Sequence, residues 1–451
     1  MAWSGSLRAS RRHPGYHVGR CLPKLLGWLS MKVLFVHNNF PAQFRNVVEA
    51  LKEIGDFELA AIGAEGAQTA PGVAVLRYAI PSVDVSATHP FARRFDAECR
   101  RAEYVLMATT ALAFAGFIPD IILAHCGWGE TLPLRAVFPK ARLVVYCEFF
   151  YRGEGQDVHF DPEGPRLGVD GLAALHCKNA SSLLALTDAD AGISPTDWQR
   201  STFPREFHNK IQVAHEGVDL QRFRPDEAAR FPLPGGKVLT KSDEVVTFVS
   251  RNLEPVRGYH AFMRGLPEIL RARPDAQIVI AGGDGNSYSH APPPGRSWKT
   301  HYLDAVVSKL DLSRIHFVGR LAPDAYLSLL QVSSAHVYLT YPFVLSWSLL
   351  EAMATECEII ASDTGPVREV IDDQRNGVLV PFTDTSSLAH AVVQALGGRQ
   401  QHSERGRAAR ATIATRFDKK KCVRDALRAI GVDEQTRTGN RASLVALERA
   451  S

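Results

Sequence analysis

Short apolar segments alternate with helical patterns from residue 32 onward, and this alternation restricts the fold more than any other feature of the chain. Strands that alternate with helices of ten or more residues build β-α-β units, whose strands lie parallel in a sheet. At 451 residues the chain is also too long for one ordinary core. The sequence therefore predicts an α/β protein with more than one parallel sheet.

The alternation falls into two blocks, separated by a stretch rich in proline, glycine and charge at Asp219–Asp243. The strands expected in the first block are Val33–Val36, Phe57–Ile62, Ile121–Ala124 and Leu143–Cys147, and the helices are Phe44–Glu53, Arg94–Phe114, Gly171–Ala185 and Thr196–Phe203. The strands expected in the second block are Val245–Ser250, Gln277–Ala281, Ile315–Val318, Ala335–Leu339 and Glu358–Ala361. Its expected helices are His260–Arg271, Lys299–Leu310, Asp324–Gln331, Ser346–Ala354 and Thr385–Leu396, followed by a helical segment Ser403–Ile430. Two doubly wound, Rossmann-like domains with a ligand cleft between them, beyond the carboxyl ends of their strands, are the simplest architecture.

The composition excludes several classes of protein. A net charge of +4 spread over this length does not favour a nucleic-acid partner. The seven cysteines form no CxxC pair, which predicts buried thiols in a reducing compartment and no structural zinc. No apolar run approaches the roughly 20 residues of a membrane-spanning helix. We expect a cytoplasmic protein, and the alternative is peripheral contact with the inner face of the membrane.

The segment Tyr341–Ala354 carries the clearest chemical signal. It joins the predicted strand Ala335–Leu339 to an apolar helix whose one carboxylate is Glu351. A strand-to-helix junction leaves backbone N–H groups free to bind phosphate. A carboxylate further along the helix can accept hydrogen bonds from a ribose, so the segment predicts a nucleotide-sugar site.

This segment resembles the signature of the retaining glycosyltransferases of family 4, which have the GT-B fold. The family has two glutamates eight residues apart around a glycine-rich turn, then Ala-Met-Ala. Glu351 matches the second glutamate, whereas Phe343 replaces the first, and Val344 and Ser346 replace the turn glycines. The chain is therefore similar to a bacterial-type subgroup that lacks the first glutamate. The resemblance spans roughly residues 31–415 and includes Asn376-Gly377.

The resemblance implies where the domains lie. We predict an acceptor-side Rossmann-like domain at 31–225, a linker at 226–243 and a nucleotide-sugar domain at 244–415. A helix and tail at 416–451 would return to the first domain. Residues 1–30 are basic and contain no acid, and we interpret them as a disordered or misannotated extension. A basic arm that touches anionic lipid is the alternative for that segment.

Donor-binding residues are predicted in the second domain. Arg251 and Arg257 lie between a strand and a helix, where guanidinium groups can grip phosphate oxygens. The resemblance implies that they stabilise the departing diphosphate, so that no metal or other cofactor is needed. Gly282 and Gly283 end the next strand and would let the backbone approach the donor. At the altered turn, Ser346 and the backbone N–H of Trp347 are expected to bind the phosphate.

The first domain carries the remaining candidates. His125 ends a predicted strand and matches the family histidine that contacts the donor sugar or its phosphate. Asn38 follows the first strand and is a second candidate for donor contact. Glu148, Arg152 and Glu154 combine acids and a cation among aromatic residues, a mixture typical of carbohydrate binding. We predict them as acceptor-site residues, although an ordered loop would look the same.

We interpret the chain as a glycosyltransferase of the hexosyltransferase type. It would move a sugar, with retention, from a nucleoside-diphosphate sugar to a hydroxyl of a saccharide, lipid-linked or protein acceptor. Synthesis of cell-surface polysaccharide or another glycoconjugate is the expected role. Two alternatives stay open, a GT-B nucleotide-sugar epimerase and a nucleotide-sugar-binding protein without activity.

Overall fold

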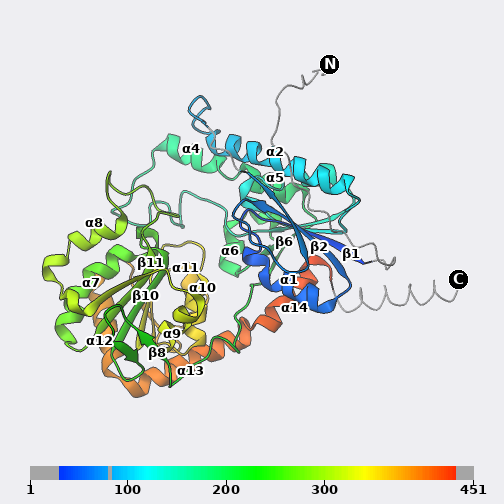
Figure 1. Ribbon diagram of the computed structural model, residues 1–451. Helices are drawn as coiled ribbons and strands as arrows, with labels where there is room; N and C mark the ends of the chain where they lie inside the picture. The colour runs from blue at the N-terminus through cyan, green and yellow to red at the C-terminus, as the bar shows by residue number, and fades with distance from the viewer. Residues whose placement is uncertain (1–29, 80–83, 433–451) are drawn as a thin grey trace. The chain divides into compact units, whose positions relative to one another are not determined.

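The structure is a computed structural model that describes residues 30–79 and 84–432 (Figure 1). The N-terminal extension predicted at 1–30 lies outside the described residues except for Ser30, and so does the predicted tail beyond residue 432. Both sheets belong to one unit of the chain, which begins at Met31. Within 30–79 and 84–432, none of the helices combines the length and apolarity needed to cross a membrane.

The first sheet has seven parallel strands in the order β3-β2-β1-β4-β5-β6-β7. The strands are β1 (Met31–Val36), β2 (Phe57–Ala64), β3 (Val73–Tyr78), β4 (Ile121–His125), β5 (Arg142–Tyr146), β6 (Ala191–Ser194) and β7 (Ile211–Val213). The helices of this half are α1 (Arg45–Ile54), α2 (Arg93–Phe114), α3 (Leu134–Val137), α4 (Val169–Cys177), α5 (Ala180–Asp188) and α6 (Asp197–Thr202). The central strands β1 and β4 are apolar because helices cover both faces of the sheet.

The second sheet has six parallel strands in the order β12-β11-β10-β13-β14-β15. The strands are β10 (Val245–Asn252), β11 (Gln277–Gly283), β12 (Ile315–Gly319), β13 (Ala335–Tyr338), β14 (Ile359–Ser362) and β15 (Val378–Val380). The helices of this half are α7 (Tyr259–Ala272), α8 (Trp298–Asp304), α9 (Pro323–Val332), α10 (Trp347–Ala354), α11 (Gly365–Arg368), α12 (Thr385–Gly397) and α13 (Arg399–Arg416), and the chain then continues into α14 (Lys419–Ile430). The predicted class, α/β with two Rossmann-like sheets, is confirmed.

The sequence missed several elements and merged others. The short strands β3, β6, β7 and β15 were not predicted, because three- to six-residue apolar segments are weak signals. The helix expected at Gly171–Ala185 is two helices, which separate at Lys178 and Asn179. The helical segment expected at Ser403–Ile430 is also two helices, α13 and α14. The stretch predicted as a linker contains a small antiparallel ladder of β8 (Arg230–Pro232) and β9 (Val238–Thr240).

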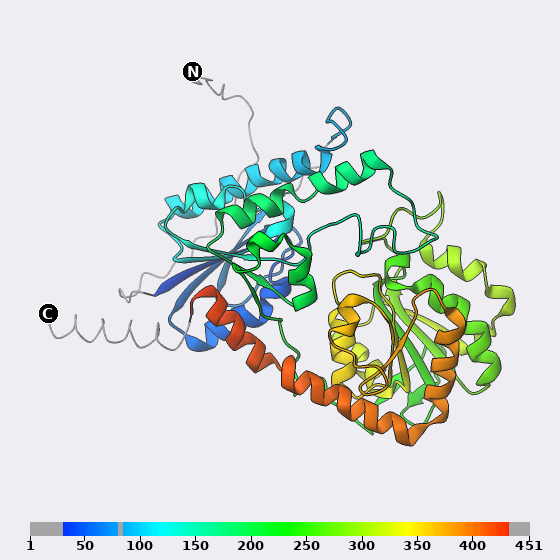
Figure 2. The ribbon, with the colours of Figure 1, turned by 180° about the vertical axis from the view of Figure 1, so that it is seen from behind.

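The last two helices run from the second sheet to the first (Figure 2). Helix α13 packs on α10, and its Ala409 and Ile413 lie in the core of the second half. Helix α14 packs on α1 and β6, with Ala429 and Ile430 in the core of the first half. The chain passes between the two halves at Phe417 and Asp418, and a backbone hydrogen bond from Val218 N–H to Phe417 fixes the crossing.

Gly217 packs closely against the start of α14, so substituting it measures how tightly that helix is packed. Its φ of +83° is in the left-handed region, and an added Cβ would stand 2.6 Å from the Cα of Lys419. Gly55 has a similar φ of +94° but open space around the added Cβ. We expect Gly55→Ala to cost about 1–2 kcal/mol from the backbone alone. Gly217→Ala should cost clearly more, measured by the urea midpoint, and equal costs would contradict close packing of α14.

Candidate active site

Histidine and glutamate side chains gather at the carboxyl ends of the first sheet. His125 ends β4, is buried, and lies with its Nε2 3.5 Å from a carboxylate oxygen of Glu148, which follows β5. Burial by itself would lower the pKa of His125, but the hydrogen-bonding interaction with Glu148 and its charge raise it. His125, predicted to contact the donor, and Glu148, predicted to contact the acceptor, therefore lie side by side.

Glu148 is placed to accept a further hydrogen bond. Its Oε1 accepts from the Gln43 side chain at 2.7 Å, and its side chain keeps 27% of its surface exposed. Burial alone would raise the pKa of this carboxyl, but His125 and Gln43 hold it below its ordinary range. Glu148 is therefore an ionised acceptor that a ligand can reach.

The other candidates of the first half have different surroundings. The Asn38 N–H donates to Glu130 at 3.1 Å, and the Asn38 side-chain oxygen is buried without a partner in the described structure. The guanidinium of Arg152 donates to the carbonyl of Phe203 at 2.9 Å, so it ties its loop to the end of α6. Glu154 is exposed. The structure places Asn38 near the His125–Glu148 pair and gives Arg152 a structural contact.

His37 is a residue that sequence reasoning missed. It follows β1 directly, it is only 3% exposed, and its ring lies 5.2 Å from the ring of His125, edge to face. Burial, followed by the nearby His125, lowers the pKa of His37 to about 3, so the ring is neutral. Its position at the end of the first strand, next to Asn38, was the available signal.

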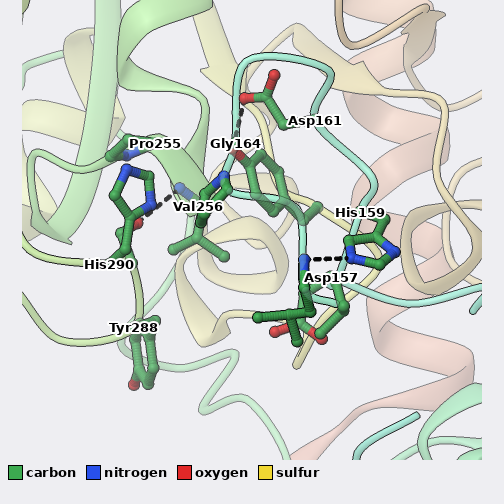
Figure 3. A pocket seen from close by; sticks show the side chains of 13 residues that line it. Asp157, His159, Asp161, Gly164, Pro255, Val256, Tyr288 and His290 are labelled. Atoms are coloured by element: carbon green, nitrogen blue, oxygen red, sulfur yellow. Dashed lines mark hydrogen bonds between the residues drawn. The ribbon is translucent and has the colours of Figure 1, made fainter. Parts of the chain in front are cut away.

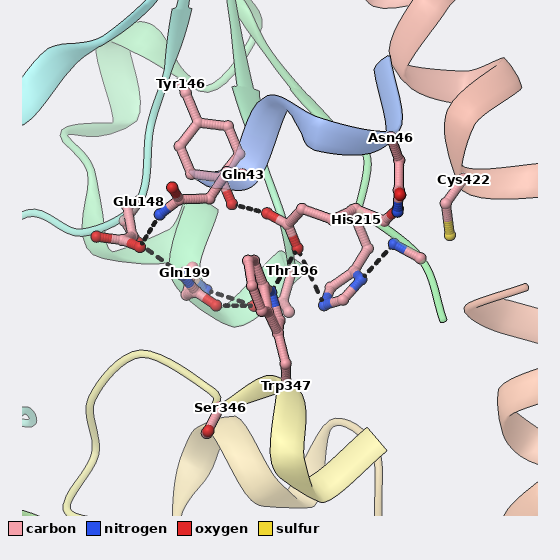
Figure 4. A network of polar contacts seen from close by, with 12 residues as sticks. Gln43, Asn46, Tyr146, Glu148, Thr196, Gln199, His215, Ser346, Trp347 and Cys422 are labelled. Carbon is pink, nitrogen blue, oxygen red and sulfur yellow. Dashed lines mark hydrogen bonds and ion pairs between the residues drawn. The ribbon is translucent and has the colours of Figure 1, made fainter. Parts of the chain in front are cut away.

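A second polar network joins the two halves (Figure 4). Glu216, beyond β7, accepts a hydrogen bond from the Tyr146 hydroxyl and lies 3.4 Å from His215. Its other oxygen accepts from the Trp347 indole at 3.1 Å, and Trp347 is the first residue of α10. The carboxyl end of the first sheet therefore contacts the helix that follows β13 in the second.

The carboxyl end of β10 carries the predicted cation Arg251. This side chain is exposed and has no hydrogen bond or ion pair in the described part of the chain. A Cβ on Gly283, at the end of β11, would come within 2.7 Å of Arg320, whose guanidinium bonds Asn252 at 3.0 Å. Gly282 is packed against Leu253 and the Ser250 carbonyl in the same way. Two guanidinium groups and a glycine-lined backbone thus meet at adjacent strand ends.

Arg257, the second predicted cation, is built into the protein. It is 9% exposed, and its guanidinium donates to Thr340 Oγ1 and to the Val344 carbonyl, both at 2.9 Å. Its charge also lies over the rings of Tyr288 and Phe343, at 5.5 and 5.7 Å. In this structure Arg257 holds the loop between β13 and α10.

Phe343, which replaces the first glutamate of the family signature, is buried. It packs edge to face on Phe149 of the first half, with 4.8 Å between ring centroids, and on Tyr288 at 5.2 Å. This position therefore offers an aromatic contact between the halves in place of a carboxylate for sugar hydroxyls.

The start of α10 is partly occupied. The Ser346 N–H donates to the Tyr338 hydroxyl at 2.8 Å, while the Ser346 side chain caps the helix at Ser348. Glu351 accepts from the Tyr326 hydroxyl at 2.7 Å. Burial raises the pKa of Glu351, and Tyr326 with the charges of Arg222 and Arg45 opposes that effect. The backbone N–H of Trp347 has no acceptor among the described residues. At this turn, the Trp347 N–H is therefore free to bind a ligand, whereas the Ser346 N–H is not.

Residues 148–168, here called the strap, leave the first sheet after β5 and reach the second half. Asp161 is buried, lies 3.0 Å from His260 Nε2, and accepts from the Tyr341 hydroxyl. Burial by itself would raise the pKa of Asp161, but the hydrogen bonds from His260 and Tyr341 hold it well below its ordinary range. At the exposed surface, Glu163 pairs with Arg264. Sequence reasoning missed this anchor because an aspartate among prolines and glycines reads as an ordinary loop.

A cavity of about 150 Å³ lies beside the strap (Figure 3). His159 and Asp161 line it from the strap, and Tyr288, His290 and Tyr341 line it from the second half. Pockets for ligands of drug size usually measure about 300–1,000 Å³. We therefore do not assign this cavity to a sugar nucleotide.

Comparison with known proteins agrees with this geometry. Residues 55–223 match the family described as Glycosyl transferase family 4 group, and residues 243–397 match Glycosyl transferases group 1. The chain has the GT-B fold of glycosyltransferases. The predicted resemblance to family 4 is thereby confirmed in outline, whereas retention and the role of Phe343 stay predictions.

The sequence relatives are distant. D-inositol 3-phosphate glycosyltransferase of Nocardia farcinica is 25% identical over 196 residues, which are 43% of this chain and 41% of that protein. Glycogen synthase of Mycobacterium tuberculosis is 28% identical over 209 residues, 46% of this chain and 45% of that protein. The chain thus spans less than half the length of these curated relatives.

Solved structures show the same fold over most of the chain. Sucrose-phosphate synthase of Thermosynechococcus elongatus has a TM-score of 0.66 and 16% identity, and covers 92% of this chain and all of its own. Anabaena HepE in complex with UDP and glucose has a TM-score of 0.59 and 14% identity, covering 89% of this chain and 99% of its own. At these identities the likeness concerns the fold alone.

Proposed function

We propose that this protein is a retaining glycosyltransferase that moves a sugar from a nucleoside-diphosphate sugar to a hydroxyl of a saccharide acceptor. The families matched by its two halves and the UDP-bound state of a structural neighbour support the donor class. Two relatives are named for D-inositol 3-phosphate and for glycogen, both of which carry many hydroxyl groups, and these names support a polyhydroxylated acceptor. Lipid-linked and protein acceptors, and a role in cell-surface glycoconjugate synthesis, remain part of the proposal.

One observation carries the proposal most directly. The strand ends of the first sheet present His125 and Glu148, those of the second present Arg251, and contacts such as Trp347–Glu216 join the two edges. Ligands of doubly wound sheets bind beyond the carboxyl ends of the strands. A sugar diphosphate held by the second half would therefore present its sugar to the first.

The groups of the second half suit the leaving diphosphate. Arg251 is exposed and unpaired within the described residues, so it can turn toward phosphate oxygens without breaking another contact. The free N–H at Trp347 begins α10, where the helix dipole favours an anion. Arg257 contributes positive charge from beneath and keeps the loop in place. Glu351 is assigned to the ribose, and the scheme includes no metal or other cofactor.

The transfer itself needs few protein groups. The bond between the anomeric carbon and the diphosphate oxygen breaks, the acceptor oxygen bonds to that carbon, and the acceptor proton passes to the leaving phosphate. Positive charge placed where negative charge develops supplies most of the acceleration. The geometry favours a transferase over an epimerase, because one half holds the donor groups and the other carries further carbohydrate-binding candidates.

A direct assay tests the function. The purified chain would be mixed with UDP-, GDP- and dTDP-sugars in a thermal-shift panel, then with the stabilising donor and either D-inositol 3-phosphate or maltose. We expect sugar nucleotides of one of the three bases to raise the melting temperature of the protein. With the acceptor present, we expect the nucleoside diphosphate to be released. Binding without release or transfer would favour the non-catalytic alternative, to which the buried Phe343 and occupied Arg257 also point. An altered sugar released without acceptor would indicate an epimerase.

A further inference from the structure

Three histidines at strand ends of the first sheet share one local geometry. The Nδ1 atoms of His37, His125 and His215 accept the backbone N–H two residues further on, at 2.9, 3.1 and 2.9 Å. A ring nitrogen that accepts a hydrogen bond carries no proton, so in the neutral ring the proton is on Nε2. Each of these histidines therefore presents an Nε2–H donor.

Two of the three donors face a carboxylate and one does not. The Nε2 of His125 lies 3.5 Å from a carboxylate oxygen of Glu148, too far for a well-formed hydrogen bond, and that of His215 lies 3.4 Å from Glu216. The Nε2 of His37 is buried with no hydrogen-bond partner among the described residues, although Asn38 and Gln43 approach it. A buried donor without a partner is costly unless a ligand completes it.

The surroundings of His37 define the chemistry of that ligand. The His37 ring lies 5.2 Å from the His125 ring, whose Nε2 is 3.5 Å from Glu148, and Gln43 donates to Glu148 at 2.7 Å. A phosphate oxygen would be repelled by Glu148, and an ammonium group cannot accept from an N–H. A neutral hydroxyl both accepts and donates, so it satisfies His37 and Glu148 together.

We infer that His37 and Glu148 bind one uncharged hydroxyl of a sugar ring, with His37 Nε2 donating to the hydroxyl oxygen and Glu148 accepting its hydrogen. This subsite rests on the proposed function and adds a residue that positions the sugar. The sugar can be that of the donor or that of the acceptor, since both offer such hydroxyls.

An unpaired imidazole N–H alone does not make such a site. His336 in β13 is fully buried, its Nδ1 bonds Thr247 at 2.8 Å, and its Nε2 has no described partner. No carboxylate acts on it, because burial is the sole cause that lowers its pKa, to about 4. His336 therefore serves as a matched control for burial and for the unpaired donor.

Three variants separate the roles of His37. His37→Asn retains an acceptor for the Asn39 N–H, because an Asn side chain bonds the amide two residues on, and it deletes the Nε2–H. His37→Gln puts an amide N–H near the Nε2 position and should restore binding. His336→Asn is the control. For each protein, the affinity ratio between every sugar nucleotide of the panel and its free nucleoside diphosphate measures binding of the donor sugar.

We expect His37→Asn to weaken sugar binding by about 3- to 10-fold, the worth of one hydrogen bond, with little change in melting temperature. A loss in the affinity ratio assigns the hydroxyl to the donor sugar. An unchanged ratio with unchanged donor hydrolysis, but a raised KM for D-inositol 3-phosphate or maltose, assigns it to the acceptor.

The opposing outcomes are distinct. If His37→Asn changes neither the affinity ratio nor the KM for the acceptor, or changes them no more than His336→Asn does, the hydroxyl subsite is refuted. The proposed function then stands. If His37→Asn lowers the melting temperature and His37→Gln fails to restore sugar binding, His37 is structural. A wild-type protein that binds no member of the panel refutes the proposed function, and this subsite with it.

Discussion

Arg251→Ala is expected to lower the turnover of glycosyl transfer by about 100-fold or more, the scale measured when one preorganised donor is removed from an active site. The loss should appear in kcat, because charge accumulates on the diphosphate oxygens only as the glycosidic bond breaks. Arg251 is exposed and has no partner in the described structure, so folding should be unaffected. Unchanged melting temperature together with lost turnover would separate catalysis from stability.

Two variants control this experiment. Arg271 on α7 is also exposed and has no hydrogen bond or ion pair within the described residues, and it lies in the last turn of that helix, away from the strand ends. Arg271→Ala should retain full turnover. Arg251→Lys retains the charge but loses the forked geometry of guanidinium, so it should fall between the two. A loss below about threefold in Arg251→Ala would argue against any role of this residue at the diphosphate.

Asp161→Ala should destabilise the protein by about 1–3 kcal/mol for each buried donor that loses its acceptor. The substitution leaves the His260 and Tyr341 groups buried without their acceptor. Glu163→Gln breaks the neighbouring pair with Arg264, which is exposed, and should cost about 1 kcal/mol or less. Urea midpoints of the two variants give the comparison, and equal midpoints would show that Asp161 does not anchor the strap.

The pKa of Asp161 adds a pH dependence to this prediction. Its folded-state pKa lies below the value of about 3.9 for an unfolded chain. The folded state therefore binds fewer protons, and the contribution of Asp161 is complete at neutral pH and declines as pH falls below about 4. Asp161→Asn removes the titrating group, so the stability difference between wild type and this variant should shrink in acid. A constant difference between pH 7 and pH 3 would contradict an ionised Asp161 in the folded protein.

Much of the molecule was predictable from local pattern. Strands such as β1 and β4 are apolar runs because both faces of a parallel sheet are covered, and such runs are visible in a sequence. His125, Glu148 and Arg251 became candidates because the strands that end at or near them could be recognised. Short strands such as β7, with only Ile211 buried, left no comparable pattern. Glu216, which follows β7, was therefore missed.

Contacts between distant segments were beyond the reach of sequence reasoning. Arg257 was predicted as a phosphate ligand from its position before a helix, yet its environment is set by Thr340 and Val344, more than 80 residues away. The effect of Phe343 likewise depends on Phe149 of the other half. Nothing in the local pattern around either residue shows such partners.

The sequence by itself determined the α/β class, the two Rossmann-like sheets and the strand ends at which ligands are expected to bind, because hydrophobic periodicity and strand-end chemistry are local properties. The tertiary structure alone decided which of the predicted side chains are available. It placed His125 beside Glu148, left His37 Nε2 and Arg251 without hydrogen-bond partners in the described chain, and put the Arg257 guanidinium over two adjacent rings. Burial and hydrogen-bond satisfaction depend on residues far apart in sequence, and they become visible only when the chain is folded.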